Sequence, residues 1–266
     1  MNDHPCIEAM LSRASVRRYK PAVPADDVIE AVALAGRQAP FATQSYSVLL
    51  SREPERHPFN APLYFIVCVD FHKFDRIMQR RGWKPVLNDL FRFLLGAQDA
   101  AYCAQNMVQA AEALGMGTCF IGFVPMQAKA LRERWKLPSR VFPLVGLTMG
   151  YPDETPPPRP RFPLSFTLFE GRYPDFTDEQ LDEAACVMDE GYLAQDYYRK
   201  LNAMIKLPEG MDETFDLDNY SWTEHICRKI GLWAADPAEL LRQFEACGFE
   251  LTTPRSDLED TPADES

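Results

Sequence analysis

Apolar residues recur along this chain with two spacings, one helical and one typical of strands. Helical spacing predicts four helices in the first half of the chain, over residues 6–11, 26–36, about 85–114 and 125–135. Short runs of β-branched and aromatic residues predict four strands, over residues 45–50, 62–69, 118–121 and 142–149. The second strand is apolar almost throughout, as expected when both faces of a strand are covered.

The second half of the chain is predicted to be helical. Its helices are expected over residues 178–201, 223–232 and 237–247. Ser221 and Glu224 predict a reciprocal cap at the start of the second of these, and Gly248 ends the third. Six of the twelve residues 152–163 are prolines, which predicts an extended, stiff arm. Because helices alternate with strands, the fold class is α+β (α/β), with one central sheet wrapped by helices.

The composition indicates an acidic globular chain. Its 266 residues carry 28 Lys and Arg against 39 Asp and Glu, a formal net charge of −11, which disfavours nucleic acid and anionic lipid as partners. The sequence has no apolar run of about 18 residues, and residues 1–6 lack the basic flank of a secretory signal. We expect a cytoplasmic protein that binds neither nucleic acid nor membranes. A single domain is expected over 1–251, with a helical extension from about residue 177 and a disordered acidic tail over 252–266.

The sequence lacks the residue patterns that several classes of chemistry require. The seven cysteines are scattered without C-x-x-C spacing, and the four histidines form no pair at the spacing of a zinc site. G-x-S-x-G, P-loop, H-E-x-x-H and C-x-x-C-H patterns are absent from the sequence. We therefore expect neither disulfides nor a metal site, and nucleophilic or metal-dependent hydrolysis has no residues to support it.

Two small arginine clusters stand out against the acidic background. In an extended segment Arg13, Ser15 and Arg17 point to the same side, and two guanidiniums beside a hydroxyl suit a phosphate group. Arg159 and Arg161 have the same spacing in the proline-rich arm, which loses little entropy on binding an anion. Each cluster alone is also compatible with a solvated surface, whereas a bound dianion explains both.

Small residues mark two further features. Gly122 follows a predicted strand, where a residue without Cβ either forms a turn or lets a flat ring approach the backbone N–H groups. Gly115 and Gly117 stand between a helix and a strand, the reverse of a dinucleotide-binding loop, so that loop is excluded. The alanine-rich stretch 97–114 predicts close helix packing, inside a core or across a subunit boundary.

In their order along the chain, these segments resemble the nitroreductase family of FMN enzymes, especially its larger, oxygen-insensitive members and the bacterial flavin reductases. Residues 13–17 (Arg-Ala-Ser-Val-Arg) resemble the phosphate motif of the family, and residues 150–161, from Gly-Tyr-Pro to Arg-Pro-Arg, resemble its closing motif. Residues 39–44 (Ala-Pro-Phe-Ala-Thr-Gln) lie where the family has a loop that touches the flavin of the other subunit. Residues 97–122 resemble the dimer helix and the strand that leads to the ring.

The resemblance implies a central mixed sheet wrapped by helices, in a homodimer whose interface holds two FMN molecules. It implies an NAD(P)H-dependent FMN oxidoreductase (nitroreductase-like) that passes reducing equivalents to a flat acceptor such as a nitroaromatic, a quinone or a flavin. A non-catalytic FMN-binding protein, for storage or sensing, is the alternative. The residues that the resemblance assigns to the FMN site are Arg13, Ala14, Ser15, Arg17, Ala39, Pro40, Phe41, Ile121, Gly122, Phe123, Arg159 and Arg161.

The sequence departs from the family pattern at several of these positions. Ala14 stands where an arginine is common, which removes a side chain but leaves the backbone donor. Phe41 and Ala42 replace a serine-rich loop, so fewer hydroxyl donors face the flavin. Phe123 stands where a glycine is common, which narrows the expected ring pocket.

The electron donor is expected to bind near residues 209–218, which are acidic in this chain. NADPH differs from NADH by a 2′-phosphate, a dianion that is normally bound by arginine or lysine. Unless Arg199, Lys200 or Arg228 supplies that cation, we expect NADH to be used at least as well as NADPH.

Overall fold

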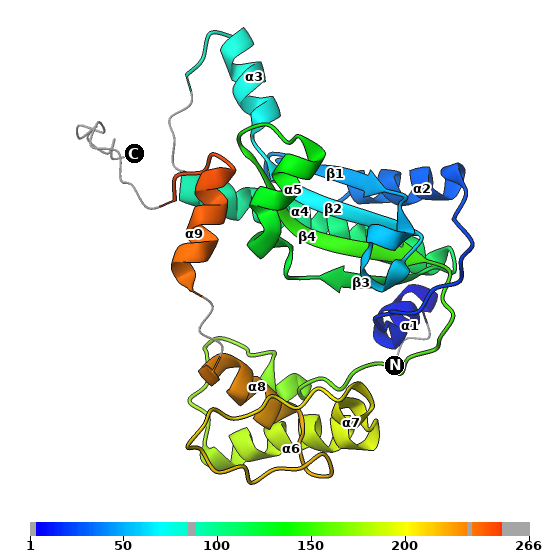
Figure 1. Ribbon diagram of the computed structural model, residues 1–266, viewed down its shortest axis with the longest axis vertical. Helices are drawn as coiled ribbons and strands as arrows, with labels where there is room; N and C mark the ends of the chain where they lie inside the picture. Colours follow the sequence, from blue (N-terminus) through cyan, green and yellow to red (C-terminus); the bar gives the residue numbers. More distant parts are fainter. Residues whose placement is uncertain (1–3, 85–88, 233–235, 252–266) are drawn as a thin grey trace, which may run out of the picture. The chain divides into compact units, whose positions relative to one another are not determined.

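A four-stranded sheet forms the centre of the fold (Figure 1). In the computed structural model, which describes residues 4–84, 89–232 and 236–251, the strands pair in the order β1-β2-β4-β3. Their bounds are Tyr46–Ser51 for β1, Leu63–Asp70 for β2, Gly117–Ile121 for β3 and Val141–Gly150 for β4. These strands pair antiparallel, and an isolated parallel bridge joins Ser15 to Thr118 of β3. The four predicted strands are confirmed.

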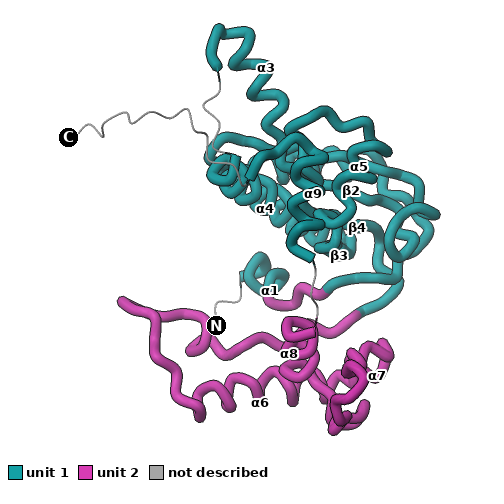
Figure 2. The backbone as a smooth tube through the Cα atoms, turned by 60° about the vertical axis from the view of Figure 1, so that its left-hand side comes forward, with its two compact units in different colours: residues 1–10, 15–155, 236–266 teal, residues 11–14, 156–235 magenta. Residues whose placement is uncertain are grey.

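The chain divides into two compact units (Figure 2). The first contains the described parts of residues 1–10, 15–155 and 236–266, and the second contains residues 11–14 and the described parts of 156–235. The helical extension expected from about residue 177 is therefore shared between the units. The single functional domain over 1–251 stays a prediction, and the acidic tail over 252–266 lies outside the described residues.

Helices flank the sheet in the first unit. Its α-helices are α1 (Pro5–Ser12), α2 (Asp26–Arg37), α3 (His72–Arg80), α4 (Asp89–Ala113), α5 (Ala128–Trp135) and α9 (Pro237–Ala246). Its short 3₁₀ helices are η1 (Pro54–Arg56), η2 (Pro58–Asn60) and η3 (Val124–Gln127). The helices expected in this unit are confirmed, with η3 forming the first turn of the one that was expected over 125–135.

Two helices differ from the prediction: the described part of one begins later than expected, and the other was not predicted. The long helix expected over about 85–114 is α4, and residues 85–88 lie outside the described part of the chain. The sequence pattern did not indicate α3, because its nine residues are mostly charged or polar and its apolar positions are few. No helix in residues 4–84, 89–232 or 236–251 is both long enough and apolar enough to cross a membrane.

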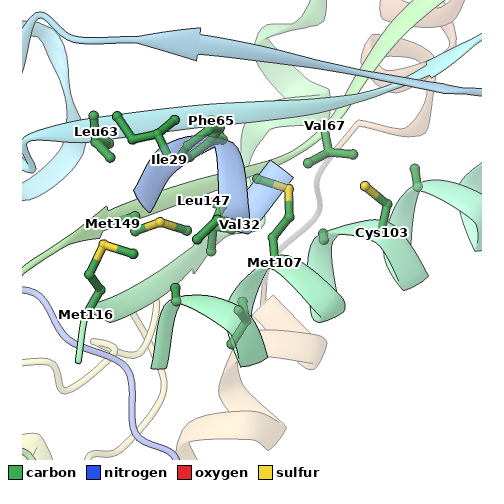
Figure 3. Close-up of a cluster of buried hydrophobic side chains, with 14 of the residues drawn as sticks. Ile29, Val32, Leu63, Phe65, Val67, Cys103, Met107, Met116, Leu147 and Met149 are labelled. Atoms are coloured by element: carbon green, nitrogen blue, oxygen red, sulfur yellow. The ribbon is translucent and has the colours of Figure 1, made fainter. Parts of the chain in front are cut away.

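Both faces of the sheet are covered by other parts of the chain, and β2 has apolar side chains on both sides that pack against them. Its odd-numbered residues, from Leu63 to Val67, pack with buried residues of α2 and α4 in the cluster drawn in Figure 3. Its even-numbered residues, from Tyr64 to Cys68, belong to a second cluster that includes side chains of α5. Every residue of β2 is buried, which confirms the interpretation of its continuous apolar run.

The alanine-rich part of α4 packs closely, as predicted. Gly36 of α2 lies so near to it that a Cβ added to Gly36 would stand 2.6 Å from Cγ of Met107. Ala100 and Ala111 are fully buried against the sheet side of the helix. Small residues at these positions allow the two helices and the sheet to approach one another.

The second unit is helical. Its elements are α6 (Asp178–Ala194), α7 (Tyr197–Leu201), α8 (Trp222–Leu232) and the 3₁₀ helix η4 (Leu164–Phe166). The single helix predicted over 178–201 is wrong, because Asp196 adopts a φ of 52° and the helix restarts as α7. Residues 153–163 form no helix or strand, in agreement with the expected extended arm.

The start of α8 is capped by another helix. The hydroxyl of Ser221 donates to the carbonyl oxygen of Asp189 on α6, at 2.9 Å. The carboxylate of Asp189 accepts the backbone N–H of Thr223 at 2.8 Å, and also its hydroxyl. Glu224 forms an ion pair with Arg228 instead. The predicted reciprocal cap between Ser221 and Glu224 is therefore replaced by a cap from Asp189.

Candidate functional site

The segment over residues 15–19 runs in extended form beside the sheet. Ser15 forms the parallel bridge to Thr118, and the N–H of Val16 donates to the carbonyl oxygen of Thr118 at 2.9 Å. Val16 is buried, whereas Ser15 and Arg17 are half-exposed. Alternate residues of an extended chain point to opposite sides, so Ser15 and Arg17 share the open side. The shared side agrees with the predicted spacing, and the binding of a phosphate there stays a prediction.

Residues far away in the sequence hold this segment in place. The carboxylate of Glu154 accepts the backbone N–H groups of Arg17 and Arg18, at 2.5 and 3.0 Å. The hydroxyl of Tyr19 donates to the carbonyl oxygen of Val16 at 2.7 Å and lies 2.9 Å from the hydroxyl of Thr148. Burial raises the pKa of Tyr19 well above its usual range, so this hydroxyl stays protonated.

The guanidinium of Arg17 makes no hydrogen bond or ion pair with a described residue of the first unit. Its nearest aromatic neighbour is Phe59, whose ring centre lies 6.0 Å from Cζ. Phe59 and Asn60 adopt φ angles of 61° and 49°, in the left-handed region that disfavours such side chains. A half-buried cation without an acid partner among the described residues, on the same side as a serine hydroxyl, is chemically suited to bind a phosphate group.

The chain leaves open space where β3 ends. A Cβ added to Gly122 would meet no atom within 4 Å. Phe123 follows with 60% of its surface exposed, and η3 begins directly after it. No described atom requires a glycine here for packing. The geometry thus allows a flat ring to approach the backbone at Gly122.

The loop over residues 39–44 is held by a buried carboxylate. Ala39 is buried, whereas Pro40 and Phe41 are exposed. Asp99 of α4 accepts hydrogen bonds from the backbone of this loop, beginning with the N–H of Ala42 at 2.7 Å. The exposed tip of the loop is therefore attached to the central helix of the unit.

Of the other predicted site residues, Ile121 is half-buried at the end of β3 in the first unit, and four belong to the second unit. Arg159 donates to the side-chain oxygen of Gln195 at 2.7 Å, and its guanidinium lies 3.8 Å from the ring centre of Tyr197. Arg161 is exposed and donates to the carbonyl oxygens of Arg159 and Pro160. Arg13 and Ala14 are half-buried in the same unit. That these residues reach the same phosphate as Ser15 and Arg17 stays a prediction.

Three cations of the second unit are already bound to acids or carbonyls. Arg228, with 3% of its side chain exposed, pairs with Glu213 and Glu224 at 2.6 Å. Arg199 pairs with Asp196 at 3.0 Å and also with Asp218. Lys200 donates to the carbonyl oxygen of Gln195 at 2.8 Å. None of these side chains has a free charge to offer to a phosphate in this arrangement.

Sequence analysis missed the residues that hold the site in position. Glu154, Tyr19, Phe59 and Asp99 were not singled out, because each acts on a segment that is distant in sequence or through a backbone group. The only available signal was the position of Glu154, four residues after the Gly150 that ends β4. In the described residues, no group of three or more His, Cys, Asp and Glu side chains is arranged to hold a metal ion.

Comparisons with known proteins identify the family. The model of the Nitroreductase family matches residues 50–151. The chain is 31% identical to the Cr(VI) reductase of Pseudomonas sp. (strain G-1) over 181 residues, which cover 62% of this chain and 74% of that protein. It is 27% identical to the FMN reductase (NADPH) of Bacillus subtilis (strain 168) over 189 residues, which cover 65% of this chain and 76% of that protein.

The fold is also found among solved structures. NfrA1 of B. megaterium superposes with a TM-score of 0.77 at 24% identity, over 92% of this chain and 99% of that one. This likeness confirms the α+β fold class that was expected from the alternation of helices and strands. Together with the sequence matches, it leads to one assignment: the chain belongs to the nitroreductase family.

Proposed function

We propose that this chain is an FMN-dependent oxidoreductase that passes reducing equivalents from NADH or NADPH to a flat electron acceptor such as a nitroaromatic, a quinone or a flavin. Membership of the nitroreductase family supports this, as do relatives that are named as an FMN reductase (NADPH) and a Cr(VI) reductase. The single observation that carries the proposal is the open side of residues 15–17. There a serine hydroxyl and a guanidinium without an ion pair to any described residue share one side of the extended segment beside β3.

The side chains and backbone groups of this chain have binding and orienting roles in the proposed reaction. Ser15 and Arg17 hold the phosphate, and the exposed backbone around Gly122 faces the ring. FMN supplies the hydride and electron transfer when it is bound, so no side chain is needed as an acid or a base. The remaining proposed FMN contacts are those of Arg13, Ala14, Ala39, Pro40, Phe41, Ile121, Phe123, Arg159 and Arg161.

We also propose that the protein is a homodimer in the cytoplasm. Leu90, Leu94 and Tyr102 on α4 are 52%, 53% and 46% exposed in the single chain. An apolar face of this kind on a central helix is typical of an interface between subunits. All seven cysteines are free thiols, as is usual in a reducing compartment.

Two measurements test the proposed function. The protein as purified should show the visible absorbance of bound flavin, and anaerobic mixing with NADH or NADPH should bleach it. A nitroarene or a quinone should then restore the absorbance. A protein that holds flavin but is reduced by neither nucleotide would instead be a storage or sensing protein. A colourless protein that takes up no FMN would contradict the proposal as a whole.

A further inference from the structure

Asp99 is a buried carboxylate that accepts several hydrogen bonds from the backbone of one loop. It lies on α4 with 1% of its surface exposed. One oxygen accepts the N–H of Ala42 at 2.7 Å. The other accepts the N–H groups of Thr43 and Ser45, at 3.1 and 3.0 Å, and the hydroxyl of Thr43 at 3.3 Å. Four donors from residues 42–45 thus converge on one side chain.

Among the described residues, these donors compensate the carboxylate of Asp99. No arginine or lysine among the described residues forms an ion pair with it, although most buried acids need such a partner. Backbone N–H groups that converge on an anion are an alternative source of compensation. If the loop left Asp99 it would lose all four of these hydrogen bonds, which hold its backbone in the observed conformation.

The fixed conformation is one that the loop would not adopt by itself. Gln44 has a φ of 56°, in the left-handed region that only glycine occupies readily. It lies between Thr43 and Ser45, whose N–H groups both bind the same carboxylate oxygen. Asp99 thus stabilises an unfavourable backbone angle and directs the tip of the loop, where Phe41 has 55% of its surface exposed.

We propose that Asp99 is a positioning residue for FMN, which sets the shape of the loop over residues 39–45 before the flavin binds. The inference rests on the proposed function, because that loop is one of the proposed FMN contacts. A loop that is ordered in advance loses less entropy on binding, so its ligand binds more tightly. Asp99 itself does not touch the flavin and acts through the backbone that it holds.

The substitution Asp99→Asn tests this with almost no change in volume. An amide has one acceptor oxygen, so its NH₂ group must face either the N–H of Ala42 or those of Thr43 and Ser45. We expect the dissociation constant of FMN from the apoprotein to rise at least tenfold, measured by quenching of flavin fluorescence. The backbone amides of Ala42, Thr43 and Ser45 should exchange hydrogen faster, and the circular dichroism of the bound flavin should change.

A matched control separates positioning from general stability. Asp89 is also buried on α4, but it binds Arg140 at 2.7 Å and the N–H of Glu250 at 2.9 Å. Asp89→Asn should lower the melting temperature and leave the affinity for FMN within twofold. Asn106→Ala, which removes a hydrogen bond from α4 to Ala35, is a milder control with the same expectation.

The outcomes are distinct. An Asp99→Asn protein that melts at a lower temperature but binds FMN with unchanged affinity and an unchanged flavin spectrum would overturn the inference. If that variant does not fold, Ala42→Pro removes one donor without altering α4, and FMN affinity equal to that of the wild type would likewise overturn it. A wild-type protein that binds no FMN at all would refute the proposed function, whatever the variants do.

Discussion

At the scale of single residues, Arg17 is the cation on which flavin binding should depend most. Its guanidinium forms no ion pair with a described residue and lies 6.0 Å from the ring centre of Phe59, so its N–H donors are free to bind a phosphate. A charge-assisted hydrogen bond contributes about 1.5–3 kcal/mol, which corresponds to roughly a ten- to hundredfold change in affinity. Arg17→Ala should weaken FMN binding by that factor, and Arg161→Ala should do the same if the second unit reaches the phosphate.

Arg18 provides the matched control for this measurement. It follows Arg17 directly but is exposed, and its side chain donates to the carbonyl oxygen of Asp153 at 2.9 Å. Arg18→Ala should leave the dissociation constant of FMN unchanged in an equilibrium titration. Unchanged flavin occupancy in both Arg17→Ala and Arg161→Ala would show that these residues do not bind the phosphate of FMN.

A substitution at Gly122 distinguishes two interpretations that the sequence leaves open, a structural turn and the approach of a flat ring. If the glycine only forms a turn, Gly122→Ala should be harmless, because its φ lies outside the left-handed region and the new Cβ meets no atom within 4 Å. If a flat ring approaches the backbone there, the added methyl group should weaken FMN binding without lowering the melting temperature. We expect the second result. Gly36→Ala is the contrasting variant: it should destabilise the fold, by about 1–3 kcal/mol, through its contact with Met107.

The candidate site could be predicted from the sequence only where its chemistry lies in consecutive residues. The spacing of Ser15 and Arg17 indicated their shared side, and the extended structure of that segment bears this out. The group that holds Arg17 in place is Glu154, 137 positions further along the chain. Asp99 stands 57 positions from Ala42. Such pairings depend on the arrangement of the sheet and α4, and no local pattern encodes them.

At the scale of elements, the ion pair between Glu213 and Arg228 joins the acidic segment to α8. The hydrogen bonds from Arg228 lower the pKa of Glu213 from its ordinary value of 4.5 to about 2. A carboxyl with a lowered pKa stabilises the folded state above its ordinary value, and that contribution is lost as the pH falls toward 2. Glu213→Gln should therefore lower the melting temperature at pH 7, and its difference from the wild type should shrink below about pH 4.

Glu209 is the control for that pH dependence. It lies in the same acidic segment, is exposed, and has no ion pair among the described residues. The melting temperature of Glu209→Gln should match that of the wild type at pH 7 and also below about pH 4. A Glu213→Gln protein as stable as the wild type at pH 7 would show that the acidic segment is not held by this pair.

Strands and amphipathic helices were predictable because burial leaves a periodic trace in the sequence. The continuous apolar run of β2 has this origin, since both of its faces are covered. Two features were not predicted from the sequence, for physical reasons. α3 is short and only Phe74, Ile77 and Met78 among its nine residues are apolar, so its pattern does not stand out from the charged residues around it. The break between α6 and α7 is made by the left-handed conformation of Asp196, a residue that does not itself mark a helix end in the sequence.

At the scale of the whole molecule, the apolar residues exposed on α4 should be covered by a second copy of the chain. Obligate interfaces bury about 2,000–5,000 Å² or more, so the dimer should persist at micromolar concentration. Light scattering should give twice the mass of the chain. Leu94→Glu places a charge on this face and should produce monomers that retain little flavin. A wild-type monomer that stays loaded with flavin at micromolar concentration would contradict the dimer.

The choice of electron donor also depends on the molecule's overall charge and on how its cations are used. The chain has a net charge of −11, and residues 209–218 contain Glu209, Asp212, Glu213, Asp216 and Asp218. Arg199, Lys200 and Arg228 each have a partner within the second unit. To bind a 2′-phosphate, Arg228 would have to leave Glu213 and Glu224, which would leave two acids facing the incoming dianion.

We therefore expect NADH to reduce the bound flavin at least as efficiently as NADPH. Arg199, Lys200 and Arg228 are bound within the second unit, so the 2′-phosphate gains none of them and meets like charges, although salt screens much of that repulsion at physiological ionic strength. Stopped-flow reduction of the holoenzyme by each nucleotide measures the ratio of the rate constant to the dissociation constant. Raising the salt concentration should move the ratio for NADPH toward that for NADH, because only NADPH carries the additional dianion. Lys206 is an exposed lysine just before the acidic segment in the sequence. A preference for NADPH of more than tenfold, lost in Lys206→Gln, would instead identify Lys206 as the cation that binds the 2′-phosphate.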